Sequence, residues 1–320
     1  MPELSILIPV FNEEESLPEL QDWIVRVMDD AGLDVELLYI DDGSTDGSWQ
    51  VIQALSKKDP RVKAVRFIRN YGKSAALDVG FSRASGAVVV TMDADLQDSP
   101  EEIPELYRMV REEGYDLVSG WKRKRYDPLS KTLPSRFFNG VTRLLSGIRL
   151  HDFNCGLKAY QQRVVKNIHI YGEMHRYIPL IAKWNGFGNI GEKEVAHRPR
   201  KYGTTKFGLE RFVHGFLDLI SVSFVNRYRK NPMHFFGAFG TLSFLSGFVI
   251  TLWLALEKIQ GLRRGISVRE ITDQPLFFLA LVALIIGVQL FLTGFLAEMM
   301  TSNNSGKADY NIAEEIKEKS

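Results

Sequence analysis

Cysteine is almost absent from this chain of 320 residues, since Cys155 is the only one. A single cysteine excludes an intrachain disulfide and a zinc site built from several thiolates. This composition is typical of a reducing compartment, and we expect the thiol to be buried and inert. The first residues, MPELSILIPV, also lack a basic region and a small-residue cleavage site. They predict a first β-strand and not a secretory signal.

A strong net charge is lacking as well, because the formal charge is only +1. A global attraction to nucleic acid therefore does not explain this chain, and no nucleic-acid partner is expected. Although positive and negative charges nearly balance, apolar residues are unevenly distributed along the chain. Residues 1–230 mix polar and apolar stretches, whereas residues 233–297 are mostly apolar. The sequence thus predicts a globular part followed by a membrane part.

Short apolar runs alternate with amphipathic stretches in the first part. The runs at 4–10, 35–40, 62–68, 87–92 and 116–120 predict strands, and residues 15–31, 47–58, 73–84 and 102–113 predict helices. This alternation predicts an α/β fold with a mainly parallel sheet and helices on both faces. Ligands of such sheets bind beyond the carboxyl ends of the strands. The segments PVFNEEES, DDGSTDG and DADLQD each follow a predicted strand, so we expect them at one edge.

The segment DADLQ, residues 93–97, has the character of a metal site. Asp93 and Asp95 alternate in an extended segment, and Gln97 offers a carbonyl oxygen. Hard oxygen ligands suit Mg²⁺ or Mn²⁺, which commonly share phosphate oxygens of a substrate. A divalent ion on a diphosphate neutralises charge on a departing nucleotide. The alternative, a solvated acidic loop, becomes less favoured once three such loops share an edge.

The segment DDGSTDG, residues 41–47, allows two interpretations. Asp42 and Asp46 are placed to accept hydrogen bonds from a base or ribose, and Gly43 and Gly47 permit close backbone approach. The other interpretation is an ordinary turn in which Asp46 caps the helix that follows. The segment taken alone favours the turn.

Two long runs without formal charge occupy the second part, at residues 233–256 and 275–297. At about 1.5 Å per residue each run is about 35 Å long, which is enough to cross a bilayer. The alternative is a buried helix pair in a soluble protein. Small-residue pairs, Ser243 with Gly247 and Ala283 with Gly287, permit close helix contact and a homo-oligomer. Two spans place both termini on the same side.

Amphipathic character marks the segment between the two parts. Apolar residues at helical spacing in 207–230, followed by basic residues, predict an interfacial helix on anionic headgroups, and 135–148 is a second candidate. An ordinary helix packed on the globular part is the alternative. The predicted organisation is a catalytic domain at 1–206, an interfacial helix and basic linker at 207–232, spans at 233–257 and 275–298, a loop at 258–274 and a polar tail at 299–320.

The combined motifs resemble family-2 glycosyltransferases with the GT-A fold, which is a Rossmann-like mixed, mainly parallel sheet. The matching segments are IPVFNEEES, DDGSTDG, NYGKSAALDVGF, MDADLQDSPEEIP and DFNCGLKAY, within about residues 4–206. With two C-terminal spans, the layout resembles the polyisoprenyl-phosphate glycosyltransferases of the GtrB type and, more distantly, dolichyl-phosphate mannose synthase. This resemblance implies a metal-dependent transferase of the inner membrane that uses a nucleotide sugar and a polyprenyl phosphate.

The resemblance also implies a role for individual residues. The residues that would bind the nucleotide sugar are Pro9, Asn12, Glu13, Asp42, Lys73, Asp93, Arg198 and Lys206, with Asp42 on the base. Asp93, Asp95 and Gln97 would hold Mg²⁺ or Mn²⁺ and the diphosphate. Asp152 would lie beside the sugar or the reaction centre. The residues given catalytic roles are Asp95, Asp152, Arg123 and Arg136.

Two basic stretches supply candidates for phosphate recognition, because a guanidinium donates hydrogen bonds in a fixed fork. In WKRKRYDPLSKTLPSR the resemblance places the acceptor lipid phosphate on arginines, with Arg123, Arg125 and Arg136 as candidates. HRPRKYGTTKF resembles a family loop that closes over the donor, with Thr205 where serine is usual. The alternative for both stretches is a solvated basic face.

The expected reaction follows from the acceptor. A phosphate monoester has a second pKa near 6 and is largely dianionic at neutral pH. It attacks an anomeric carbon without a strong base, so we predict a single displacement with inversion. UDP-glucose is the first-choice donor by analogy, with undecaprenyl phosphate as acceptor, and GDP-mannose with a polyprenyl-phosphate mannose synthase is the alternative. The catalytic domain and both termini are expected in the cytoplasm, where nucleotide sugars are found.

Other classes fit less well. A processive polysaccharide synthase usually carries a QxxRW motif and more spans, and none of the tryptophans lies in such a motif. A non-catalytic membrane scaffold has no physical need for Asp93, Asp95 and Gln97. A pore is disfavoured because the two uncharged runs contain no ionisable group except His234.

Overall fold

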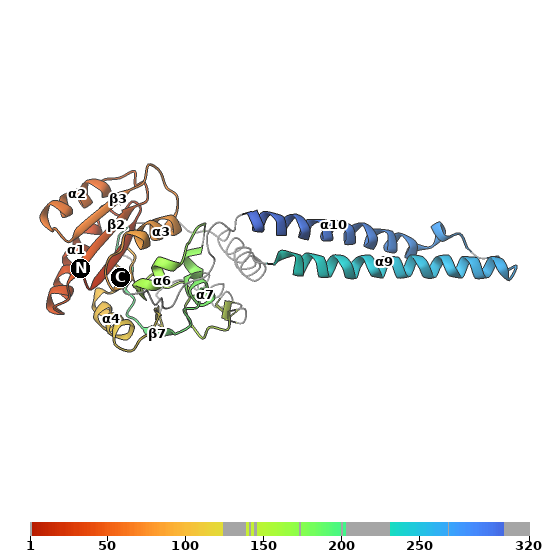
Figure 1. Ribbon diagram of the computed structural model, residues 1–320. Coiled ribbons are helices and arrows are strands. Elements are labelled where there is room, and N and C mark those ends of the chain that lie inside the picture. Colours follow the sequence, from red (N-terminus) through yellow and green to blue (C-terminus); the bar gives the residue numbers. More distant parts are fainter. Residues whose placement is uncertain are drawn as a thin grey trace, which may run out of the picture. The chain divides into compact units, whose positions relative to one another are not determined.

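The computed structural model describes residues 2–123, 139–140, 142–143, 146–172, 174–199, 201–202, 231–267 and 269–303. These residues fall into two compact units, of which the first includes those up to Tyr202 and the second those from Asn231 (Figure 1). The predicted interfacial helix at 207–230 lies outside the described residues. Each unit is therefore described by itself.

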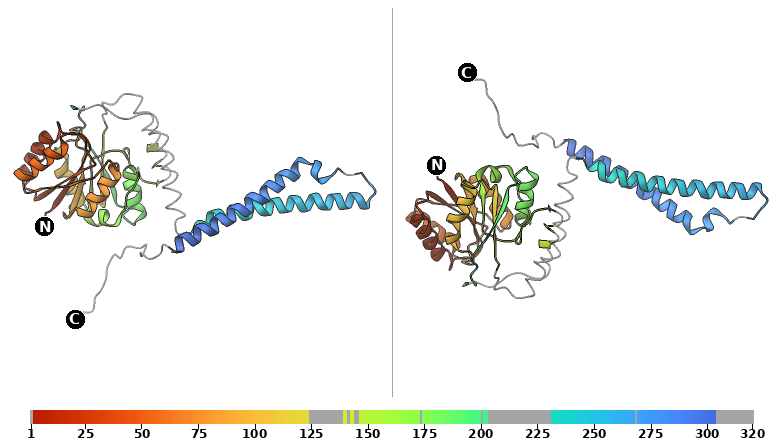
Figure 2. Two further views of the ribbon diagram at one scale, coloured as in Figure 1. Left: turned by 90° about the horizontal axis from the view of Figure 1, so that it is seen from above. Right: turned by 90° about the horizontal axis from the view of Figure 1, so that it is seen from below.

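The first unit is a seven-stranded sheet with helices on both faces (Figures 1 and 2). The strands lie in the order β3-β2-β1-β4-β6-β5-β7. Their bounds are β1 Leu4–Val10, β2 Val35–Asp41, β3 Val62–Arg66, β4 Val88–Thr91, β5 Leu117–Trp121, β6 Lys158–Gln161 and β7 Ile190–Glu194. β6 is antiparallel to β4 and β5, and the other pairs are parallel. The predicted α/β class and mixed, mainly parallel sheet are confirmed.

Helices cover both faces of the sheet because the central strands carry buried apolar side chains on each face. The helices are α1 Leu17–Asp30, α2 Ser48–Lys58, α3 Lys73–Arg83, α4 Ile103–Arg111, α6 Gln162–Asn167 and α7 Ile178–Trp184, with 3₁₀ turns η1 Pro100–Glu102 and η2 Met174–Tyr177. Leu4, Ile6 and Ile8 of β1 join one core with side chains of α1, α2 and α4. Leu7, between them, faces α3, where a Cβ on Gly80 would lie 2.1 Å from the Leu7 side chain. This period of two places α3 opposite α1 and α4.

The predicted amphipathic stretch at 135–148 contributes buried residues to this unit. Asn139 and Thr142 are buried, and the Arg143 guanidinium donates to the Leu150 carbonyl at 3.0 Å. The Lys183 ammonium donates to the Ser146 carbonyl at 2.9 Å. The described part of this stretch therefore packs on the globular unit, and its predicted position on lipid headgroups stays a prediction.

A buried carboxylate, Glu36, joins three segments at the sheet edge opposite the strands' carboxyl ends. It accepts from Ser5 Oγ at 2.5 Å, from Ser85 N at 2.7 Å and from Lys63 Nζ at 2.6 Å. Burial opposes its ionisation, but these hydrogen bonds outweigh burial and lower the pKa from 4.5 to about 2. A carboxylate with a lowered pKa stabilises the fold above its unfolded-state pKa, and that contribution is lost as the pH falls through the folded-state pKa.

Replacing Glu36 by Gln is expected to lower the free energy of unfolding by up to about 3 kcal/mol at pH 7. Thermal unfolding of the full chain and of Glu36→Gln, at pH 7 and near pH 3, measures the difference. The gap between the two melting temperatures should narrow as the pH falls from 4.5 towards 2. Equal melting temperatures at pH 7, or a gap independent of pH, would contradict this account.

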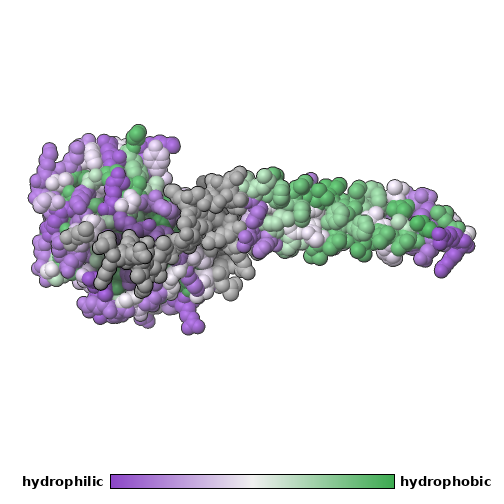
Figure 3. Space-filling model, viewed as in Figure 1, coloured by the Kyte–Doolittle hydropathy of each residue, from purple (hydrophilic) through white to green (hydrophobic). Residues whose placement is uncertain are grey.

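The second unit is a hairpin of two long helices, α9 Pro232–Arg263 and α10 Pro275–Asn303, joined through η3 Ile271–Asp273. Both are long and apolar enough to cross a membrane, and only 17% and 11% of their most apolar windows are buried. Figure 3 shows apolar residues along most of the hairpin. Helices so little buried within the chain do not resemble the core of a soluble protein. α9 continues six residues past the predicted end of the first span at residue 257, from Lys258 to Arg263.

Small residues are used inside this hairpin. A Cβ on Gly247 would lie 2.6 Å from the Ala280 carbonyl oxygen, and one on Gly287 would lie 2.6 Å from Phe244 N. Ser243 Oγ donates to the Ala283 carbonyl at 2.8 Å. The small-residue pairs therefore bring α9 and α10 together, and they give no support to a homo-oligomer, which stays a prediction.

Candidate active site

Six strands end at the same end of the sheet, here called the carboxyl edge. β1, β2, β3 and β4 are parallel to one another, and β5 and β7 point the same way. β6 runs in the opposite direction, so it begins at this edge, with Lys158 opposite Thr91 of β4. The segment DFNCG before β6 therefore meets DADLQD after β4. The predicted gathering of polar loops is confirmed, and the segment before β6 and the loops after β3, β5 and β7 join it.

The first two loops are connected by side-chain hydrogen bonds. Asn12, whose φ is 57°, accepts from Thr45 N at 2.8 Å through Oδ1. Glu13 N donates to Ser48 Oγ at 2.8 Å. Asp46 Oδ1 accepts from Ser48 N at 3.0 Å, in agreement with the turn interpretation, although the N-cap position of α2 is occupied by Gly47 and not by Asp46. The predicted contacts of Asn12 and Glu13 with a nucleotide, and of Pro9 within β1, stay predictions.

Asp42 is buried and holds the loop between β3 and α3. Its two oxygens accept from Tyr71 N at 2.7 Å and from Gly72 N at 2.9 Å. Burial raises the pKa of Asp42 in spite of these hydrogen bonds. Gly43 has a φ of 70°, and a Cβ there would lie 2.3 Å from the Arg69 backbone. The need for glycine at a close backbone approach is thus confirmed, while base recognition by Asp42 stays a prediction.

Asp93 is ionised and surrounded by cations. Its Oδ1 is paired with the ammonium of Lys73, at the start of α3. Burial opposes ionisation, but Lys73, together with Lys122 and Lys158, lowers the pKa of Asp93 to about 2. The predicted site residues Lys73 and Asp93 therefore lie together. The concentration of positive charge around one carboxylate suits a ligand with several negative charges.

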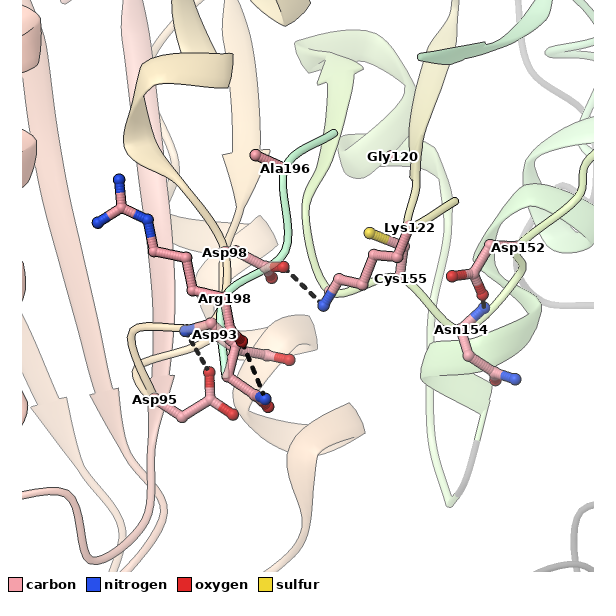
Figure 4. A network of polar contacts seen from close by, with 12 residues as sticks. Asp93, Asp95, Asp98, Gly120, Lys122, Asp152, Asn154, Cys155, Ala196 and Arg198 are labelled. Carbon is pink, nitrogen blue, oxygen red and sulfur yellow. Dashed lines mark hydrogen bonds and ion pairs between the residues drawn. The ribbon is translucent and has the colours of Figure 1, made fainter. Parts of the chain in front are cut away.

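Two further lysines, of which Lys158 is buried and Lys122 partly buried, complete the positive charge around Asp93. Lys122 pairs with buried Asp98 at 2.6 Å, and although burial opposes its charge, Asp98 raises its pKa (Figure 4). Lys158 is buried, donates to the Cys155 carbonyl, and has a pKa lowered by burial. The Cys155 thiol is buried and its pKa is raised to about 12, which agrees with the predicted inert thiol.

Asp95 and Gln97 lie on a turn of unusual backbone geometry. Leu96 between them has a φ of 61°, and Asp95 Oδ1 accepts from Gln97 N at 3.2 Å (Figure 4). Residues with a positive φ other than glycine are uncommon and concentrate at functional sites. The Gln97 amide donates to the Arg198 carbonyl at 3.4 Å. Asp95 is buried among these loops, with 9% of its surface exposed.

Asp152 lies in a tight turn before β6. Its Oδ1 accepts from Asn154 N at 3.0 Å, and it is 1% exposed (Figure 4). Its charge raises the pKa of Lys158, which also responds to the charge of Asp93. Asp93 and Asp152 are therefore electrostatic neighbours of one buried lysine. The sequence assigned Asp93 to the donor and Asp152 to the reaction centre, and both carboxylates act on the charge of Lys158.

The predicted phosphate-binding arginines are placed differently from one another. Arg123 follows β5, is mostly exposed, and pairs with Glu194 at 3.3 Å. Arg198 is not directed at Asp93, because its guanidinium stacks on Trp23 of α1 at 4.2 Å and lies 3.9 Å from Glu101 (Figure 4). Contact of Arg198 with a donor thus stays a prediction that needs a different side-chain position. Arg125, Arg136 and Lys206 lie outside the described residues.

Sequence reasoning gave no role to several residues of this site. Lys158 was within the quoted motif GLKAY, and a lysine inside an apolar strand pattern is the signal that marks it. Glu192 on β7 accepts hydrogen bonds from the Asp152 turn, and a β7 strand was not predicted. Buried Arg176 and the His175–Ser74 hydrogen bond of 3.1 Å lie beside the start of α3. These residues enter the site through contacts between segments that are distant in the sequence, which a local sequence pattern does not show.

The sheet order and the acidic turn after β4 define a glycosyltransferase of the GT-A fold. Residues 5–169, about half of the chain, match the family model described as Glycosyl transferase family 2. The chain therefore belongs to glycosyltransferase family 2. This confirms the family resemblance found in its motifs, and it makes the protein a glycosyltransferase.

Relatives of known activity extend along nearly the whole chain. Dodecaprenyl-phosphate galacturonate synthase of Rhizobium johnstonii is 35% identical over 301 residues, or 93% of this chain and 87% of the relative. Undecaprenyl-phosphate 4-deoxy-4-formamido-L-arabinose transferase of Pseudomonas aeruginosa is 33% identical over 299 residues, covering 93% and 84%. Glucosyl-3-phosphoglycerate synthase from Mycobacterium tuberculosis, solved with Mn²⁺ and UDP-glucose, has a TM-score of 0.54 at 22% identity, covering 70% and 79%. The last likeness shows the fold.

Gly156 is required for the position of Asp93. A Cβ at Gly156 would lie 2.4 Å from Asp93 Oδ2 and 2.7 Å from its Cγ. Replacing Gly156 by Ala is therefore expected to displace this carboxylate and to lower kcat/KM for glycosyl transfer by about 10- to 100-fold. Steady-state kinetics measure the change, with Gly188→Ala as control because a Cβ there meets nothing within 4 Å. An equal kcat/KM for the two variants would contradict the claim that transfer needs Asp93 in its observed position.

Proposed function

We propose that this protein transfers a sugar from a nucleotide sugar to the phosphate of a polyprenyl phosphate, with inversion at the anomeric carbon. The observation that carries the proposal is the ionised Asp93, beside Asp95, among Lys73, Lys122 and Lys158 at the carboxyl edge. Relatives that cover 93% of the chain are named for sugar transfer involving a polyprenyl phosphate, which supports the acceptor. The apolar hairpin supports a membrane location beside such a lipid.

The donor diphosphate suits the basic surroundings of Asp93. Two anionic substrates must meet at this site, and ammonium groups lower the repulsion between them and position both. Lys73 is the cation best placed to turn from Asp93 to a bound diphosphate, since its ammonium reaches the site from the start of α3. Lys158 is buried and the Lys122 side chain is 14% exposed, and both contribute through their charge.

The chemistry of Asp93 and Asp95 fits a divalent ion. Magnesium is usually held by one or two carboxylates together with substrate phosphates and water. Within the described residues no three side chains of His, Cys, Asp or Glu are placed to hold a metal. Asp93 and Asp95 would hold Mg²⁺ or Mn²⁺, with Gln97 as a further candidate. Such an ion, when bound, supplies positive charge to the leaving diphosphate.

The acceptor phosphate supplies its own nucleophile. One phosphate oxygen forms a bond to the anomeric carbon while the bond from that carbon to the donor diphosphate breaks. No proton has to be removed from a dianionic phosphate, so the carboxylate of Asp152 is not needed as a base. We assign to Asp152 the orientation of the sugar and of the neighbouring ammonium groups. Arg123, mostly exposed beside Glu194, is the described candidate for the acceptor phosphate.

The identity of the sugar is open to direct measurement. UDP-glucose is our first donor, and the sugars in the relatives' names, galacturonate and 4-deoxy-4-formamido-L-arabinose, belong in the same panel in nucleotide-linked form. Purified full-length protein is incubated with undecaprenyl phosphate, Mg²⁺ or Mn²⁺, and each donor, GDP-mannose included. Mass analysis of the lipid extract is expected to show one glycolipid. Transfer to water alone, from every donor, would contradict the lipid acceptor.

A further inference from the structure

The turn that carries Asp152 is held at every backbone polar group of residues 151 and 152. His151 N and Asp152 N donate to Glu192 Oε1 at 2.7 Å and 3.0 Å. The His151 carbonyl accepts from Asn139 Nδ2 at 2.9 Å, and the Asp152 carbonyl accepts from Ser119 Oγ at 3.3 Å. Side chains from three separate segments thus fix one short stretch of loop. These side-chain hydrogen bonds take the place of the backbone hydrogen bonds that hold a helix or a sheet.

Glu192 makes the largest contribution to this arrangement. Its second oxygen, Oε2, lies 2.6 Å from the Nδ1 atom of His151, whose ring stacks on Trp121 at 4.2 Å. The Glu192 side chain is only 11% exposed. One nearly buried carboxylate therefore accepts two backbone hydrogen bonds and pairs with the imidazole of the same turn. Loss of this acceptor leaves the N–H groups of His151 and Asp152, of which the Asp152 bond is partly buried, without their partner, which disfavours the observed backbone position.

The strand register extends this arrangement to the acceptor side. Ser119 of β5 is the register partner of Glu192, and Trp121 is the partner of Glu194. Residues two apart on a strand share a face. The guanidinium of Arg123 lies 6.0 Å from the Trp121 ring and 3.3 Å from Glu194. The same face of the β5–β7 pair thus holds both the Asp152 turn and Arg123.

We propose that Glu192 is a positioning residue for sugar transfer, which acts by fixing the Asp152 turn on the β5–β7 face. The inference rests on the proposed function, since it needs Asp152 to act at the reaction centre. In this proposal Glu192 acts through the turn and not by contact with the substrates. Its carboxylate fixes the backbone from which the Asp152 side chain extends. The Trp121–His151 stack fixes the position of that turn relative to Arg123.

The test compares Glu192→Leu with Glu192→Gln in the full-length protein. Leucine removes all three interactions, and we expect kcat to fall by about 30- to 100-fold while KM for the nucleotide sugar changes by less than about threefold. Glutamine keeps an oxygen for both N–H groups, so its kcat should stay within about threefold of wild type. A merely destabilised protein would lose active molecules in both variants and would not show rescue by glutamine.

A double variant separates action through Asp152 from an independent role. If Glu192 works through Asp152, then Asp152→Asn with Glu192→Leu should lose no more than about threefold beyond Asp152→Asn alone. Losses that multiply would overturn the proposal. If Glu192→Leu does not fold, Glu192→Asp takes its place, and a kcat equal to wild type would also overturn it. A wild-type protein that makes no glycolipid overturns the proposed function itself, whereas an active Glu192→Leu overturns only this inference.

Discussion

Replacing Asp95 by Asn is expected to lower sugar transfer by about 10²- to 10³-fold with Mg²⁺ present. Asparagine is nearly isosteric and keeps an oxygen for the Gln97 N–H, which Asp95 accepts at 3.2 Å. The turn should therefore survive, and the loss should come from the missing negative charge. That charge is needed if Asp95 and Asp93 hold the cation that stabilises the leaving diphosphate.

Initial rates of glycolipid formation over a range of Mg²⁺ concentrations measure this effect. The variant should need more Mg²⁺ for half-maximal rate, because one of two carboxylate ligands is lost. Glu105→Gln is the matched control, since Glu105 is an exposed carboxylate on α4 that pairs with Arg108. Near wild-type transfer by Asp95→Asn, with unchanged Mg²⁺ dependence, would remove Asp95 from the metal site.

Replacing Asp152 by Asn is expected to lower kcat by at least about 10²-fold and to leave the affinity for the nucleotide unchanged. Asn keeps an oxygen for Asn154 N, so the turn before β6 is preserved. What changes is the charge beside Lys158, whose pKa Asp152 raises against the lowering effect of burial. The electrostatic arrangement around the sugar is therefore altered without loss of the diphosphate site.

Steady-state kinetics together with titration of the nucleoside diphosphate separate the two effects. Asp116→Asn is the control for replacing a buried carboxylate, because Asp116 precedes β5 at the opposite edge and accepts from Asn189 N at 3.0 Å. It should keep the wild-type kcat. If Asp152→Asn and Asp116→Asn have the same kcat, Asp152 has no part in transfer and the assignment of the reaction centre is wrong.

Much of the fold was predictable because local pattern decides it. β1 has the predicted bounds, Leu4–Val10, and β2 to β5 lie within two residues of the predicted strands. The meeting of three polar loops followed from parallel strands alone. The strand pattern therefore placed Asp93 and Asp95 in the candidate site, whereas Asp152 was assigned to it from the family resemblance of its motif.

The rest depends on contacts that no local pattern contains. β6 has only four residues and begins with Lys158, and its antiparallel direction is set by pairing with β4 and β5. The position of Arg198 is decided by Trp23, which lies far away in the sequence. Small residues in the apolar runs allowed contact within the chain or between chains, and the structure shows contact between α9 and α10.

The acceptor is the centre of this account, and it is tested most directly by comparing lipids of one chain length. Purified full-length protein is given the donor identified by the panel, together with polyprenyl phosphate or the corresponding polyprenol, and the glycolipids are measured by mass. The account predicts a product from the phosphate and none from the alcohol, because only the phosphate is a dianion that attacks without a base. Equal transfer to the polyprenol, or no glycolipid from the phosphate, would contradict it.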